Sequence, residues 1–128
     1  MKTLRVGIAS YEEMKARTVA IARGLHKPAF DEPKVWFTTA ESFARVLSDR
    51  NRAVLQAIAE TAPESLAQLA ELTGRQKSNL SRTLKTMERY GFVKLERGAR
   101  GSLIPKVPYQ RISLVLPVSR QGQKTPAA

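Results

Sequence analysis

Cysteine is absent from the 128 residues, and histidine occurs only once, at His26. Without cysteine the chain can form no disulfide and no thiolate metal site, and a Ser-His-Asp triad would have to be built on that one histidine. A zinc site made of several histidines is excluded as well. His26 lies in a segment with two prolines and has no pattern of partner residues around it. We therefore expect no catalytic residues, no metal site, no cofactor and no enzymatic activity.

Long apolar runs are missing too. No stretch approaches the roughly 18–20 apolar residues that a helix needs to cross a bilayer. The start, Met1–Val6, lacks the continuous apolar stretch of a secretory signal. The sequence therefore predicts a cytoplasmic protein with no membrane partner.

Negative charge is scarce, and the positive charge is concentrated in one segment. The chain has 22 Lys and Arg against 11 Asp and Glu, a net charge of +11. Within residues 75–106 only Glu88 and Glu96 oppose nine cationic residues: Arg75, Lys77, Arg82, Lys85, Arg89, Lys94, Arg97, Arg100 and Lys106. The net charge favours a polyanionic partner, most often nucleic acid, with a membrane surface as the other candidate. The alternative interpretation of the concentrated charge is an ordinary solvated basic face.

Hydrophobic spacing, caps and turn residues predict a chain of mixed α and β structure. Helices are expected at 11–23, from 38 through 47, at 50–61, at 65–73 and at 77–90. Strands are expected at 4–8, 35–38, 92–96, 103–104 and 112–116. Three pairs have the spacing of a capping box, Ser10 with Glu13, Thr38 with Glu41 and Ser65 with Gln68.

These elements divide into three expected regions. Residues 1–34 form a strand-helix extension and a linker, residues 35–117 form the main domain with an extra C-terminal strand, and residues 118–128 form a disordered tail. In the main domain, two helices joined by a tight turn precede a glycine-tipped hairpin. That order predicts an α+β fold of the winged helix-turn-helix type.

The helix at 77–90 is the expected DNA-reading element. Leu80, Leu84 and Met87 would seat it, and its opposite face would enter a major groove about 12 Å wide. The predicted base-reading side chains are Gln76, Lys77, Asn79, Arg82, Thr83 and Thr86. Ser78, Ser81 and Lys85 are expected on phosphate oxygens, and Arg97 and Arg100 flank a hairpin tip suited to a minor groove.

The segment Ser78–Val93 resembles the recognition helix and wing of MarR-like winged helix regulators. It has the same order of small polar residues, Ser81-Arg82, Leu84 and then Gly91-Phe92-Val93, and Leu66–Gly74 is similar to the preceding helix. The resemblance covers residues 64–101. The whole layout resembles a group of short MarR-like DNA-binding proteins, some of them thought to be antitoxins of the TumA type. This resemblance implies a repressor of its own operon that also binds a cognate toxin.

The sequence departs from the MarR-like pattern at two points. Arg75-Gln76 stands where an apolar residue and a capping serine are common, so the recognition helix lacks a strong N-cap. The long flanking helices that full-size members use for dimerisation are also missing. A dimer would therefore use the N-terminal helix and the strands at 35–38 and 111–116.

Three hypotheses remain open at this stage. The first is a homodimeric regulator that binds double-stranded DNA in a sequence-specific way, most simply as a repressor. The second is a protein-interaction module that neutralises a toxin through residues 1–47 and 107–117. The third is an RNA-binding winged helix, which the scarcity of aromatic residues near the basic segment disfavours.

Overall fold

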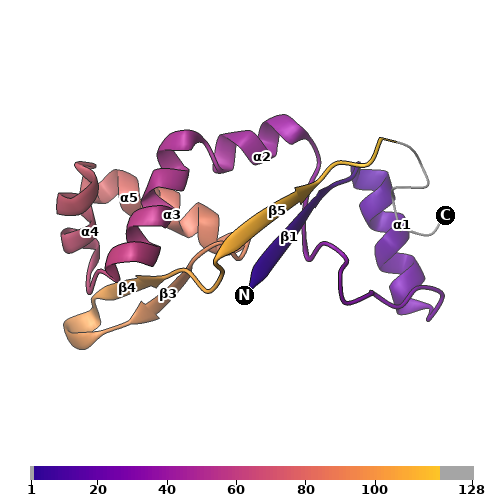
Figure 1. Cartoon of the computed structure of the whole chain (residues 1–128). Helices are drawn as coiled ribbons and strands as arrows, with labels where there is room; N and C mark the ends of the chain where they lie inside the picture. The colour runs from indigo at the N-terminus through magenta and orange to yellow at the C-terminus, as the bar shows by residue number, and fades with distance from the viewer. Residues whose placement is uncertain (1, 119–128) are drawn as a thin grey trace. The chain divides into compact units, whose positions relative to one another are not determined.

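The computed structural model describes residues 2–118 and has a mixed α+β architecture (Figure 1). The chain divides into two compact units. The first, here called the sheet unit, contains Thr3–Phe43 and the strand Arg111–Val115. The second, here called the helical unit, contains Ala44–Gln110. None of the described helices is long and apolar enough to cross a membrane.

The sheet unit is built on three parallel strands in the order β2-β1-β5, which are β1 (Thr3–Ile8), β2 (Val35–Phe37) and β5 (Arg111–Val115). In the register, Val6 of β1 lies beside Val35 on one side and beside Leu114 on the other. Because side chains alternate along a strand, these apolar residues share one face of the sheet. Val6 is fully buried there.

Helix α1 (Tyr11–Ala22) begins with the predicted capping box. The Ser10 hydroxyl accepts from the Glu13 amide at 3.1 Å, and the Glu13 carboxylate accepts from the Ser10 amide at 3.3 Å. The spacing of Tyr11, Met14, Thr18, Ile21 and Leu25 predicts an amphipathic helix. In the structure Tyr11 and Leu25 are each 74% exposed, and only Met14 and Ile21 of these five are half-buried. Ala20 is the buried residue of this helix instead.

Trp36 is the large apolar side chain of β2. Its ring lies against Gly7, where an added Cβ would collide with it, and the Arg17 guanidinium lies 5.3 Å from the ring centre. The side chain is half-buried. The sequence Val35-Trp36-Phe37 predicts either a core anchor or an exposed aromatic patch for a partner at Trp36, and these contacts favour the anchor.

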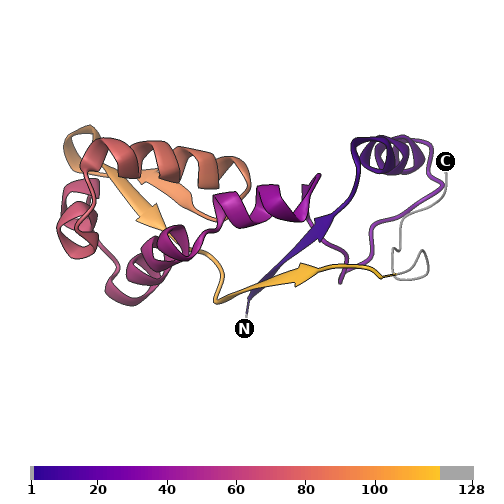
Figure 2. The ribbon, with the colours of Figure 1, turned by 90° about the horizontal axis from the view of Figure 1, so that it is seen from above.

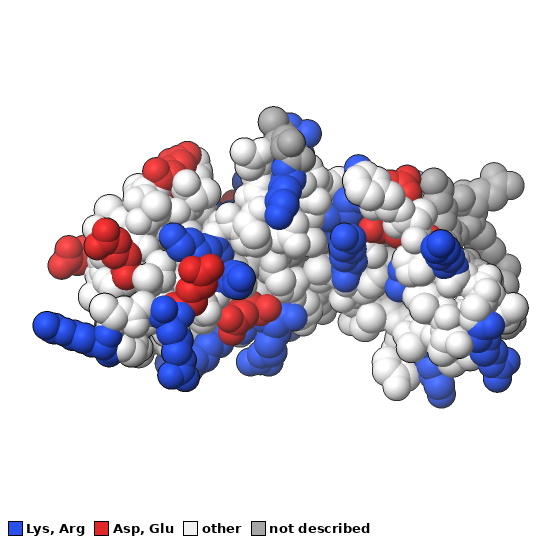
Figure 3. Space-filling model, turned by 90° about the horizontal axis from the view of Figure 1, so that it is seen from below, with Lys and Arg blue, Asp and Glu red and all other residues white. Residues whose placement is uncertain are grey.

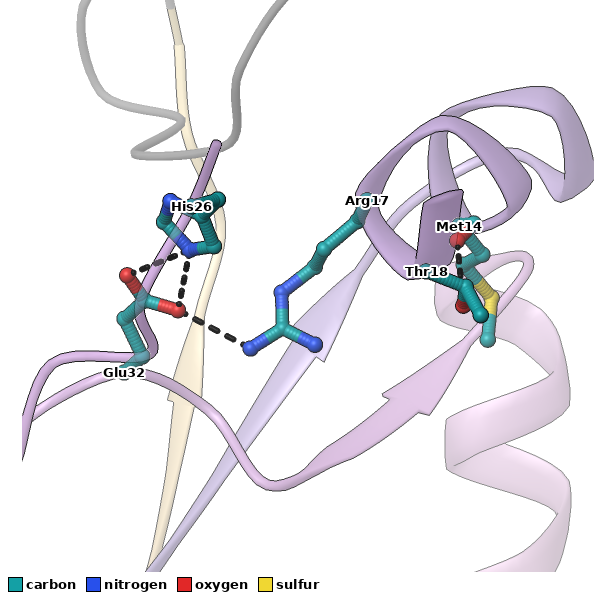
Figure 4. A network of polar contacts seen from close by, with 5 residues as sticks. All are labelled: Met14, Arg17, Thr18, His26 and Glu32. Atoms are coloured by element: carbon teal, nitrogen blue, oxygen red, sulfur yellow. Dashed lines mark hydrogen bonds and ion pairs between the residues drawn. The ribbon is translucent and has the colours of Figure 1, made fainter. Parts of the chain in front are cut away.

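The segment between α1 and β2, expected to be a linker without partners, holds a buried carboxylate. Glu32 accepts from Arg17 at 2.9 Å and contacts His26 Nε2 at 3.0 and 3.1 Å (Figure 4). Burial raises the pKa of Glu32, but the hydrogen bonds from Arg17 and His26 outweigh this effect, and the net pKa is lowered. The single histidine therefore belongs to a cluster of polar contacts that joins this segment to α1.

The helical unit contains three helices and a hairpin, with α2 (Ala40–Val46) leading into it from the sheet unit. The elements are α3 (Asp49–Thr61), α4 (Leu66–Thr73), α5 (Lys77–Arg89), β3 (Lys94–Arg97), a 3-10 turn at Ala99–Gly101, and β4 (Leu103–Lys106). The antiparallel strand β3 packs against α5, and β4 packs against α3 and α4 (Figures 1 and 2). Helix α4 therefore packs against both α3 and α5, and all three helices contact the hairpin.

Local capping residues set where these helices begin. Ser65 caps α4 by accepting from the Gln68 amide at 3.1 Å, as predicted, although Gln68 accepts from Glu64. The predicted Thr38 cap is wrong by one residue, because Thr39 accepts from the Ser42 amide at 3.0 Å. As predicted, Gln76 makes no side-chain cap for α5.

The two units divide the chain differently from the predicted regions. Residues 35–117 were expected in one domain, whereas β2 and β5 both pair with β1 at the start of the chain. Strand pairing therefore removes both segments from the helical unit. Apart from Val118, the predicted disordered tail 118–128 lies outside the described residues.

Candidate nucleic-acid interface

Helix α5 is held by a stripe of fully buried side chains. Leu80, Leu84 and Met87 each have 0% exposure and recur at spacings of four and three residues. They pack in the core with Leu69 and Phe92, whose exposures are 0% and 1%. The stripe predicted from the sequence is confirmed, and it leaves the opposite face of the helix away from the core.

The opposite face of α5 is polar and cationic. At 100° per residue, the positions farthest from the stripe are Ser78, Arg82, Lys85 and Arg89, and all four are exposed. Gln76, Lys77 and Asn79 are exposed around the first turn, while Ser81 and Thr86 are half-buried at the flanks. Arg89 was not among the predicted site residues, although its spacing from Arg82 and Lys85 is readable in the sequence.

Thr83 is predicted from the sequence to face outward, and this prediction is wrong. It is half-buried, and its Oγ1 accepts from Arg75 Nη2 at 3.1 Å. Thr86 Oγ1 donates to the Arg82 carbonyl at 3.2 Å. Thr83 thus lies on the flank of α5 that packs on the preceding turn, and it is not on the face with Arg82.

The hairpin carries the two arginines predicted at its tip. Arg97 ends β3 opposite Leu103, and Arg100 lies in the turn with a positive φ of 59°. Both side chains are exposed. At the base of the hairpin, the exposed Lys94 and Lys106 face each other across the strands. Like charges in that position repel each other, and the Glu96 carboxylate, 4.0 Å from Lys94 Nζ, offsets part of this repulsion.

Positive charge is unequally shared between the units. Ala44–Gln110 contains 12 Lys and Arg against 6 Asp and Glu, whereas Thr3–Phe43 and Arg111–Val115 together contain 7 against 5. Lys and Arg side chains project over the face seen in Figure 3, with a few acidic side chains between them. The described residues contain no group of three His, Asp or Glu placed to hold a metal ion. A cationic surface is therefore the main chemical feature of the helical unit.

Comparison with known proteins gives one family and one distant structure. A family model described as HVO_A0114 matches residues 46–114, more than half of the chain. No curated protein matches. The structure of disulfide-formed AbfR is similar with a TM-score of 0.41 and 21% identity, over 75% of this chain and 68% of that chain. A TM-score of this size does not establish a shared fold.

Proposed function

The chain belongs to the HVO_A0114 family, and we propose that it is a transcriptional regulator that binds double-stranded DNA in a sequence-specific manner. In this proposal α4 and α5 act as a helix-turn-helix, α5 enters the major groove, and the hairpin β3–β4 acts as a wing. The observation that carries it is α5 itself, with its buried stripe on one side and Ser78, Arg82 and Lys85 on the other.

The chemistry of the exposed residues supports both parts of such binding. Arginine and lysine can bond guanine, and Asn79 and Gln76 can bond adenine in the major groove. Ser78 and Lys85 suit phosphate oxygens, which orient a protein on the duplex without reading its sequence. Arg100 at the hairpin tip suits a narrow minor groove. A homodimer would bring two α5 helices to half-sites about 34 Å apart and would act most simply as a repressor.

The test is a fluorescence-anisotropy titration of the full chain with a duplex from its own upstream region and with a random duplex of equal length. We expect tighter binding to the upstream duplex and an affinity that falls steeply with salt. Arg82→Ala should lower the ratio of affinities for the upstream and random duplexes by about 10- to 100-fold, while weak binding to random DNA persists. Arg23→Ala, an exposed arginine after α1, is the matched control. Equal affinity of the wild-type chain for both duplexes contradicts the proposal.

A second proposed function, toxin binding by the sheet unit, is favoured by a separate observation. Among the described residues, all exposed large apolar side chains except Leu72 lie in the sheet unit or just after β5. They are Tyr11, Val19, Leu25, Phe30, Val115, Leu116 and Val118. Phe30 is 98% exposed. Exposed apolar residues of this kind suit a protein partner. Co-purification with the product of the neighbouring gene, lost in Phe30→Ser, supports this function, and no co-purification contradicts it.

A further inference from the structure

Arg75 is a half-buried cation in the turn before α5. The turn begins with Gly74, which ends α4 at a φ of 70°, and Arg75 follows directly. Its guanidinium donates from Nη1 to Asn51 Oδ1 and from Nη2 to Thr83 Oγ1, each at 3.1 Å. One side chain therefore bonds the first turn of α3 and the middle of α5 at the same time.

Asn51 is itself fixed in place on the other side of this contact. Its Nδ2 donates to the Val46 carbonyl at the end of α2, at 2.9 Å, and its amide donates to the capping hydroxyl of Ser48 at 3.2 Å. A continuous chain of directional bonds thus runs from the end of α2 through α3 and Arg75 to Thr83. All of these residues lie in the helical unit.

Electrostatic interactions do not favour a cation at this position. The described residues provide no carboxylate within ion-pair distance of Arg75, and its Nε is buried without a partner. Burial lowers the pKa of Arg75, and the nearby positive charge of Arg50 lowers it further. An apolar residue in this place would avoid the cost of desolvating a charge. The guanidinium is therefore better explained by where its two bonds hold the helices.

Hydrogen bonds can fix the rotation of a helix about its axis more closely than a stripe of apolar contacts can. Leu80, Leu84 and Met87 seat α5, but contacts of this kind tolerate small rotations of a helix about its axis. With side chains the helix radius is about 5–6 Å, so a rotation of about 20° moves its outer atoms by about 2 Å. Hydrogen bonds to base edges tolerate only a few tenths of an ångström around their optimum. The Arg75–Thr83 bond lies on the flank of α5, where it resists this rotation.

We propose that Arg75 is a positioning residue, which sets the rotation of α5 through Thr83 and so determines how well the protein discriminates its DNA sequence. This inference rests on the proposed function. Arg75 neither touches the bases nor supplies the phosphate affinity. Its loss should lower affinity for the cognate duplex and leave affinity for random DNA nearly unchanged.

The experiment compares two substitutions at Thr83 that separate the hydroxyl from the packing. Thr83→Val keeps the branched shape and removes the acceptor, whereas Thr83→Ser keeps the acceptor and removes the methyl group. We expect Thr83→Val to lose about 10-fold in preference for the upstream duplex over the random duplex, and Thr83→Ser to lose about 2-fold or less. If packing alone matters, Ser should be the worse substitution, and that result overturns the inference.

Arg75→Leu and Asn51→Leu test the same bond chain from outside α5. Each should reproduce the loss of preference seen in Thr83→Val, with circular dichroism melting used to verify folding. If Arg75→Leu weakens binding to both duplexes equally, Arg75 acts as a phosphate contact and the positioning role is wrong. If the variants keep the wild-type preference, this inference fails while the proposed function stands. If the wild-type chain shows no preference, both fail.

Discussion

At the scale of single residues, Glu32 is the best example of a side chain whose role depends on folding. It is 7% exposed and receives hydrogen bonds from Arg17 and His26, which come from a helix and a loop on either side of it. The sequence around His26 gives no sign of this cluster, because its members are joined only by tertiary packing. The same is true of Arg75, which the charge pattern had placed among surface cations.

Glu32→Gln should destabilise the chain by about 2 kcal/mol at neutral pH, because Arg17 would lose a buried charged partner. The pKa of Glu32 is lowered in the folded state, so its contribution is present above the ordinary value of 4.5 and is lost as the pH falls through the lowered pKa. The difference in melting temperature between the wild-type chain and Glu32→Gln should therefore become smaller below pH 4.5. Glu12→Gln, on an exposed position of α1, is the control. A difference in melting temperature that does not change with pH contradicts the proposed role of the Glu32 charge.

At the scale of elements, local signals predict where helices lie better than what they face. Ser10 and Ser65 cap helices as predicted, because capping depends on residues three positions apart. The buried face of α1 could not be predicted in this way. Ala20 is buried on this helix, whereas Tyr11 at its start and Leu25 just after its end are exposed, a difference that depends on the tertiary packing of α1. For α5, by contrast, spacing and burial agree because its core stripe is strictly periodic.

The uncapped start of α5 yields a prediction at this scale. Gln76 already has the extended conformation of an N-cap, with φ of −67° and ψ of 139°, but its side chain makes no capping bond. Gln76→Ser and Gln76→Asp should each stabilise the chain by about 0.5–1 kcal/mol in urea unfolding. The aspartate should also weaken DNA binding, because its charge lies beside Lys77 in the proposed interface. A Gln76→Asp variant that is more stable and binds DNA more tightly contradicts the placement of this helix end.

At the scale of the whole molecule, the pairing of distant segments is the part that sequence reasoning missed. Five strands were expected, but their order was not. Arg111 of β5 lies beside Thr3 of β1, although most of the chain separates them, and both neighbours of β1 run parallel to it. Parallel pairing needs a long connection and has no turn signal, so nothing in the local sequence identifies the partner strands. The helical unit is an insertion between them.

This division into units predicts how DNA affinity depends on salt. The helical unit holds 12 Lys and Arg against 6 acidic residues, a net charge of +6, whereas Thr3–Phe43 and Arg111–Val115 together hold 7 against 5, a net charge of +2. Each phosphate that the protein no longer neutralises should lower the slope of log affinity against log salt concentration by about 0.9. A triple glutamine variant at Arg82, Lys85 and Arg89 should therefore reduce the slope by about 2–3. Anisotropy titrations between about 50 and 200 mM salt would measure it.

The matched variant replaces three exposed cations of the sheet unit, Lys15, Arg23 and Lys27, and so makes the same change in net charge. Counterion release depends on cations that lie against phosphates, whereas total charge acts only through a weak, screened field. The sheet-unit variant should therefore reduce the slope by less than about 1. Equal reductions in the two variants would mean that DNA contacts both units, and α5 would no longer be the main contact. A larger reduction in the sheet-unit variant would move the proposed interface to the sheet unit and overturn its assignment to α5.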